Sequence, residues 1–134
     1  MPTRLFTRGE AEELLPRLTE LLERMRALKQ EYERFGRKVG ALSRKIRTNG
    51  HAQEGEVQQS QIGLETRAAE VNGLVEDVQA LGCEVKGIDE GLIDFRSEME
   101  GREVYLCWKL GEERIEWWHE IDTGFAGRRP IADG

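Results

Sequence analysis

Apolar residues in the first half of the chain recur at alternating intervals of four and three positions, the spacing of one face of an α-helix. This pattern is unbroken over ten positions: Leu14, Leu18, Leu21, Met25, Leu28, Tyr32, Phe35, Val39, Leu42 and Ile46. The heptad spacing predicts one long helix, which we place at residues 7–48. Thr7 and Glu10 have the spacing of a capping box at its start. Pro16 predicts a kink near the first turns, because proline lacks the backbone N–H that a helix interior needs.

A second heptad pattern follows the turn signal Asn49-Gly50. It predicts a helix at residues 56–82, with Gly82 suited to a left-handed cap. Two such helices joined by a short loop predict an antiparallel helical hairpin of coiled-coil character. Helix one is longer than helix two, so its N-terminal part needs another element to cover it.

Beyond Gly82 the apolar period changes to two, and glycines separate the segments. Residues 93–96, 104–108 and 115–118 are typical of strands, and 83–88 is a weaker candidate. Two-residue turns are expected at Glu100-Gly101 and Gly111-Glu112. The sequence therefore predicts an antiparallel β-meander at 83–121 and a C-terminal tail at 122–134. We expect the meander to pack on the N-terminal part of helix one, in an α+β fold of one domain over 1–134.

The expected turn lengths determine which side chains share a face of the sheet. They place seven apolar residues on the inner face: Ile93, Phe95, Val104, Leu106, Trp108, Ile115 and Trp117. Trp117→Ala should then destabilise the protein more than Trp118→Ala. The outer face would carry one row of Asp94, Cys107 and Glu116 and another of Arg96, Tyr105 and Trp118. A turn one residue longer after Lys109 would instead bring Cys107 and His119 to one face.

Composition limits the class of protein. The 134 residues are 38% apolar and 34% charged, which is typical of a globular chain and not of a membrane or disordered one. No apolar run is long enough to span a bilayer. Two cysteines are too few for a disulfide framework, so we expect a cytoplasmic protein.

Candidate chemistry is sparse. Asp94, Cys107, Glu116 and His119 are weak candidates for a metal or redox site, because one sulfur is fewer than structural zinc sites usually have. Acidic neighbours also disfavour a thiolate at Cys107. No Ser–His or Cys–His spacing indicates nucleophilic catalysis. We therefore expect no catalytic residue, no cofactor and no resident metal, and Cys107 as a small residue on a half-covered face.

Charge is unevenly distributed. Residues 34–53 contain six basic residues and no acid, and since the chain as a whole carries −6, the remainder carries −12. This basic stretch would lie at the tip of the helical hairpin, where it can meet phosphates or the acidic end of a second copy. Arg96, Tyr105 and Trp118 would form a row able to stack on bases, unless the tail covers it. The candidate binding residues are Arg37, Lys38, Arg44, Lys45, Arg47, Arg96, Tyr105, Trp118 and Arg128.

The C-terminal motifs add a resemblance. Leu106-Cys107-Trp108, Gly111-Glu112, Trp118-His119, Gly124-Phe125, Gly127-Arg128 and Pro130, with the N-terminal segment at 6–18, resemble a prokaryotic family known only as domain of unknown function 2203. The resemblance implies a cytoplasmic protein with no established activity and no catalytic residues to carry over.

Three functions remain open. The first is a non-enzymatic interaction module whose helical hairpin binds a partner protein or itself. The second is a nucleic-acid- or ribosome-associated factor that binds phosphates through the basic tip. The third and weakest is a metal or redox protein that uses the outer sheet face.

Overall fold

The computed structural model describes residues 4–49 and 54–132. The fold is α+β, with helices followed by a five-stranded antiparallel sheet. The chain divides into two compact units. We call residues 1–23 with 75–134 the sheet unit, and residues 24–74 the helical unit. No helix of the described ranges has the length and apolar character needed to cross a membrane.

The expected first helix is interrupted near its start. Helix α1 (Arg8–Glu13) ends with Leu14 as its C-cap, and helix α2 (Leu15–Asn49) begins at the next residue. Pro16 explains the break, because it cannot donate to the carbonyl of Glu12 and its ring crowds that turn. The predicted capping box is confirmed: Thr7 Oγ1 accepts from Glu10 N, and Glu10 Oε1 accepts from Thr7 N.

The helical unit contains the rest of α2 and most of helix α3 (Glu54–Ala80). The two helices contact each other within it, since Arg24 Nη2 lies 3.3 Å from Glu70 Oε2. The Arg67 guanidinium lies 4.8 Å from the centre of the Phe35 ring. Gly63 is required at this contact, because a Cβ there would lie 2.9 Å from the same ring. At the other end of α3, Gly82 has the predicted left-handed conformation, with φ +99°.

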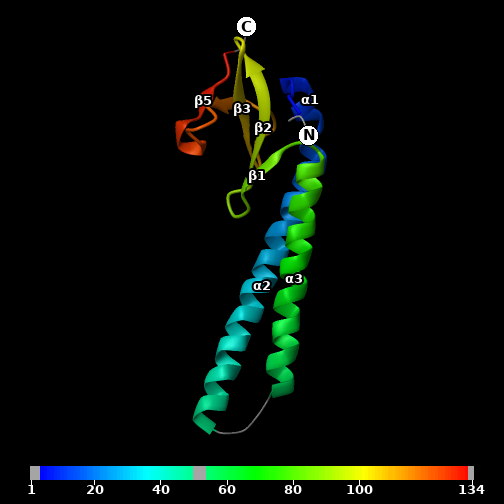
Figure 1. The fold of residues 1–134 in the computed structure, drawn as a ribbon, viewed down its shortest axis with the longest axis vertical. Helices are drawn as coiled ribbons and strands as arrows, with labels where there is room; N and C mark the ends of the chain where they lie inside the picture. The colour runs from blue at the N-terminus through cyan, green and yellow to red at the C-terminus, as the bar shows by residue number, and fades with distance from the viewer. Residues whose placement is uncertain (1–3, 50–53, 133–134) are drawn as a thin grey trace. The chain divides into compact units, whose positions relative to one another are not determined.

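The sheet has the order β1-β2-β3-β4-β5. Its strands are β1 (Glu84–Gly87), β2 (Leu92–Met99), β3 (Arg102–Lys109), β4 (Trp117–His119) and β5 (Arg129–Pro130), and β2 and β3 are the longest (Figure 1). The β2–β3 register is the predicted one, with Ile93 opposite Trp108 and Phe95 opposite Leu106. Glu100 and Gly101 close this hairpin with φ values of 54° and 82°, as a type I′ turn requires.

The predicted second turn is wrong. Residues 110–116 form a longer loop in place of the two-residue turn at Gly111-Glu112. Contacts outside the ladder hold it: Glu112 Oε1 accepts from Lys109 N at 2.7 Å, and Ile115 N donates to Glu12 Oε2 at 2.9 Å. Cys107 consequently lies opposite Trp117, and Leu106 opposite Trp118.

This shift by one residue exchanges the two tryptophans. Side chains at directly paired positions project from the same face of a sheet. Trp117 therefore shares the face of Cys107, and Trp118 shares the face of Leu106. The expected placement of Trp117 inside and Trp118 outside is wrong, and so is the basis for a larger loss of stability from Trp117→Ala. Both side chains are half-buried.

The other six predicted inner-face residues are buried, with Phe95 and Ile93 fully enclosed. Phe6 packs edge-on against Phe95, with ring centres 5.3 Å apart. From the helices, Leu15, Leu18, Leu21 and Leu22 are also buried in this unit. The C-terminal tail, which was expected as a segment after the meander that could fold back over the sheet, adds strand β5, and Ile131 N donates to Glu116 O at 2.8 Å.

Candidate functional site

Three chemically reactive side chains meet on the outer face of the sheet. Asp94 comes from β2, Cys107 from β3 and His119 from β4, and all three are buried. Their ligand atoms lie within 4.8 Å of one another. The shifted β3–β4 register creates this cluster, because it places His119 opposite Tyr105 on the face that already carries Asp94 and Cys107.

Both ring nitrogens of His119 have hydrogen-bond partners. Nδ1 lies 2.7 Å from the carbonyl oxygen of Glu120, which can only accept, so Nδ1 donates to it. Nε2 lies 2.9 Å from Asp94 Oδ2. Burial raises the pKa of Asp94, and the nearby His119 opposes that rise.

Cys107 is not arranged as a catalytic nucleophile. Burial, and then the Asp94 charge, raise the pKa of its thiol to about 11, so the reactive thiolate is scarce at neutral pH. Both ring nitrogens of His119 are already bonded to Glu120 and Asp94. A base that activates a thiol must bond to it. His119 thus bonds to Glu120 and Asp94 in this structure, whereas the base of a Cys–His–Asp triad bonds to the thiol.

A cavity of about 260 Å³ opens onto this cluster. Apart from the trio, its lining includes Lys86 and Tyr105 from the sheet and Phe125 from the tail. The tail is held in place by Arg128, whose Nη2 lies 3.1 Å from Glu112 Oε2. The Arg128 guanidinium also lies 4.5 Å from the ring centres of Trp117 and Phe125. The tail thus covers part of the outer face.

The other predicted outer-face residues do not all assemble. Glu116 is exposed and does not belong to the cluster, because the longer loop keeps it outside the β3–β4 ladder. Arg96 lies over the Tyr105 ring at 5.2 Å, as the predicted row requires. Trp118 is on the opposite face, so a row of these three is excluded. Sequence reasoning did not find Lys86, the Glu120 carbonyl or the Glu112–Arg128 pair, because none of them has a distinctive spacing.

Cys83, the second cysteine, provides a test of pH dependence. It is buried, its Sγ donates to Val78 O, and burial raises the pKa of its thiol from 9.0 to about 11. A thiol with a higher pKa in the folded state stabilises the fold below pH 9.0, and this contribution is lost as the pH rises toward 11. Urea unfolding across this range should show a steeper loss of stability for the wild type than for Cys83→Ser. Parallel curves would contradict this prediction.

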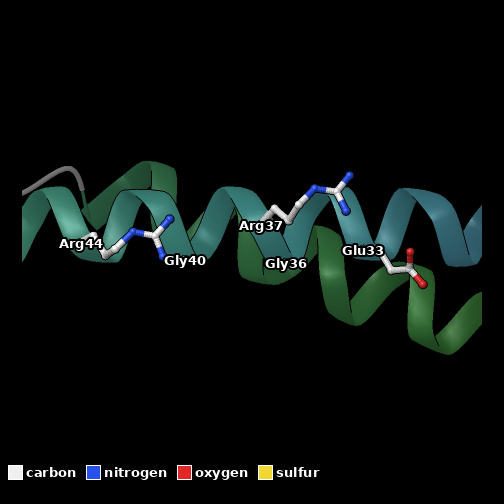
Figure 2. Close-up of a pocket in the computed structure, with 5 residues that line it drawn as sticks. All are labelled: Glu33, Gly36, Arg37, Gly40 and Arg44. Atoms are coloured by element: carbon white, nitrogen blue, oxygen red, sulfur yellow. The ribbon is translucent and has the colours of Figure 1, made fainter.

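The helical unit presents a second surface. The basic residues Arg34, Arg37, Lys38, Arg44, Lys45 and Arg47 are all exposed on α2. Gly36 and Gly40 leave a hollow of about 640 Å³ on this helix. Figure 2 shows Glu33, Arg37 and Arg44 projecting around the two glycines. A smaller hollow of about 380 Å³ beside Phe35 is lined by Arg34, Lys38 and Arg67.

Comparison with known proteins identifies a family whose function is not established. The model of an uncharacterised conserved family, domain of unknown function 2203, matches residues 4–131. The chain belongs to this family. No curated protein matches the chain, and no solved structure matches it.

Proposed function

We propose that the chain is a non-enzymatic interaction module in which α2 and α3 form a helical hairpin that binds a second copy of itself. The observation that carries the proposal is the notched basic surface of α2, made by Gly36, Gly40, Arg37 and Arg44. Exposed Tyr32 and Ile62, at 42% and 60%, add apolar surface to the same unit.

The two glycines are not required by packing within the chain. A Cβ at Gly36 would meet only Leu64 Cδ2 at 3.9 Å, and one at Gly40 only Arg44 Nη1 at 3.7 Å. Each glycine lowers helix stability by about 1 kcal/mol relative to alanine. Gly63 differs, because the Phe35 ring excludes a side chain there. The hollow at Gly36 and Gly40 therefore allows another helix to approach α2 closely.

Charge favours α3 of a second copy as that helix. The segment 34–47 of α2 carries six basic residues and no acid. Helix α3 carries six acids and one base. Opposite charges on the two helices favour an alternating contact between copies, with α2 of one chain against α3 of the other.

Filling the notch tests the proposal. Light scattering at tens of micromolar protein should show a dimer or larger species for the wild type. Gly36→Ala/Gly40→Ala should weaken self-association at least tenfold, while its melting temperature rises because alanine favours the helix. Gly9→Ala is the control, since Gly9 lies on α1 in open space, and it should associate like the wild type.

A strictly monomeric wild type would contradict the proposal, and so would a double variant that associates as strongly as the control.

The exposed basic residues favour a second candidate, a factor that binds nucleic acid or ribosomes. Lysine and arginine gain affinity for phosphates by releasing counterions, so binding should weaken steeply with salt. Replacing Arg44, Lys45 and Arg47 with glutamate should abolish retention on RNA, DNA and ribosomes at low salt. A wild-type chain that binds none of them at low salt would eliminate this candidate.

A further inference from the structure

We infer that the outer face of the sheet holds a zinc-binding site formed by Asp94, Cys107 and His119. Thiolate, imidazole and carboxylate are the donor types that zinc accepts in proteins. Hard ions such as Mg²⁺ and Ca²⁺ take oxygen donors and do not select a thiolate. The site is independent of the helical surface and of the self-association proposed above.

The separations of the donor atoms suit one ion. The ligand atoms of the three side chains lie within 4.8 Å of one another, and Nε2 of His119 is 2.9 Å from Asp94 Oδ2. Tetrahedral zinc, with bonds of about 2.0–2.3 Å, keeps its donors roughly 3.3–3.8 Å apart. Side-chain shifts of about 1 Å are therefore sufficient to bring all three atoms onto one ion.

The environment of His119 prepares it as a ligand. Its Nδ1–H donates to the Glu120 carbonyl at 2.7 Å, which orients the ring and turns Nε2 toward Asp94. Metal-binding histidines usually have this arrangement, with the second ring nitrogen donating to a carbonyl or carboxylate. The backbone that follows β4 therefore supplies the outer support that a zinc histidine needs.

Charge balance explains how a divalent ion is accepted at a buried position. A thiolate and a carboxylate together carry two negative charges, which balance the two positive charges of Zn²⁺ when the imidazole binds as a neutral ligand. Zinc ligands must be deprotonated to bind, so zinc binding releases protons to solvent. The loaded site then holds no uncompensated buried charge among its ligands.

Three protein donors leave one position of a tetrahedral ion for another ligand. The cavity of about 260 Å³ beside the trio gives a small molecule or water access to that position. The site consequently differs from a closed structural zinc site, in which four side chains surround the metal.

The two cysteines of the chain make a matched test. Both are buried and neither forms a disulfide, but only Cys107 belongs to the trio. The metal-free chain of 134 residues is titrated with Co²⁺, which reports thiolate ligation by a charge-transfer absorption band, and the band is then displaced with Zn²⁺. The wild type and Cys83→Ser should give the band at one equivalent of Co²⁺, and Cys107→Ser should give none.

Asp94→Asn is a second test variant, which still tests the site if Cys107→Ser fails to fold. It preserves the size of the side chain and removes the anionic donor, so its Zn²⁺ affinity should fall at least tenfold while its near-ultraviolet dichroism remains native. Calorimetry in buffers of different ionisation enthalpy should show net proton release when the wild type binds Zn²⁺.

The inference is overturned if the wild type gives no thiolate–cobalt band. It is also overturned if Cys107→Ser keeps the band, or if Asp94→Asn binds Zn²⁺ as tightly as the wild type does.

Discussion

Trp108→Ala is expected to lower the free energy of unfolding by about 3–5 kcal/mol, the largest loss for a single substitution in the sheet. Trp108 is 1% exposed and lies opposite Ile93, which is fully buried. Its indole Nε1–H donates to the carbonyl of Glu112 at 2.8 Å, within the loop that sets the β3–β4 register. The substitution therefore leaves a cavity in the core and removes one anchor of the loop.

Trp117→Ala is the control for this experiment. Trp117 is half-buried on the outer face and contacts Arg128, so its loss should cost about 1–2 kcal/mol. Urea unfolding of both variants, followed by far-ultraviolet dichroism, gives the comparison. A greater loss for Trp117→Ala would contradict the observed register and support the two-residue turn predicted from the sequence.

Asp94→Ala should lower the stability of the metal-free protein by about 3 kcal/mol. The substitution leaves Nε2 of His119 buried without its partner at 2.9 Å. A buried polar group that loses its partner bears the full cost of desolvation, whereas a buried pair adds little net stability when both members are present. The cost is thus a property of the broken pair and not of the aspartate alone.

The double variant Asp94→Leu/His119→Phe separates these two effects. It removes both polar groups and keeps an aromatic ring beside Tyr105, whose ring centre lies 5.3 Å from that of His119. Its stability should lie within about 1 kcal/mol of the wild type. Chemical unfolding of the single and double variants measures the coupling. Equal destabilisation of both would show that Asp94 acts through packing and not through the pair.

Features set by neighbouring residues were predictable. The capping box of Thr7 and Glu10 is local, because its partners are three residues apart. Pro16 interrupts the helix for a reason carried by its own ring. Glu100-Gly101 closes the β2–β3 hairpin because only these two residues separate two strands in which apolar and polar residues alternate. In each case the interaction that decides the local conformation joins residues only a few positions apart in the chain.

The candidate zinc site was not predictable in the same way. A two-residue turn at Gly111-Glu112 and a turn one residue longer both place a tryptophan on the inner face of the sheet. This is because residues 117 and 118 are both tryptophans. The choice between them depends on contacts distant in sequence, such as Ile115 N with the carboxylate of Glu12. The period of apolar residues cannot predict that contact. The expected row of Asp94, Cys107 and Glu116 was therefore wrong about Glu116.

The sequence by itself therefore determined the α+β class, the Thr7 capping box, the left-handed Gly82 and the first hairpin, since apolar period, capping and turn chemistry act over short distances. It also contained the three potential metal ligands, distributed over 26 residues from Asp94 to His119. Only the tertiary structure decided that these side chains meet. A shift of one residue moves every side chain of a strand to the other face, and here the loop anchored by Glu12 and Glu112 selects the register that joins His119 to Asp94 and Cys107.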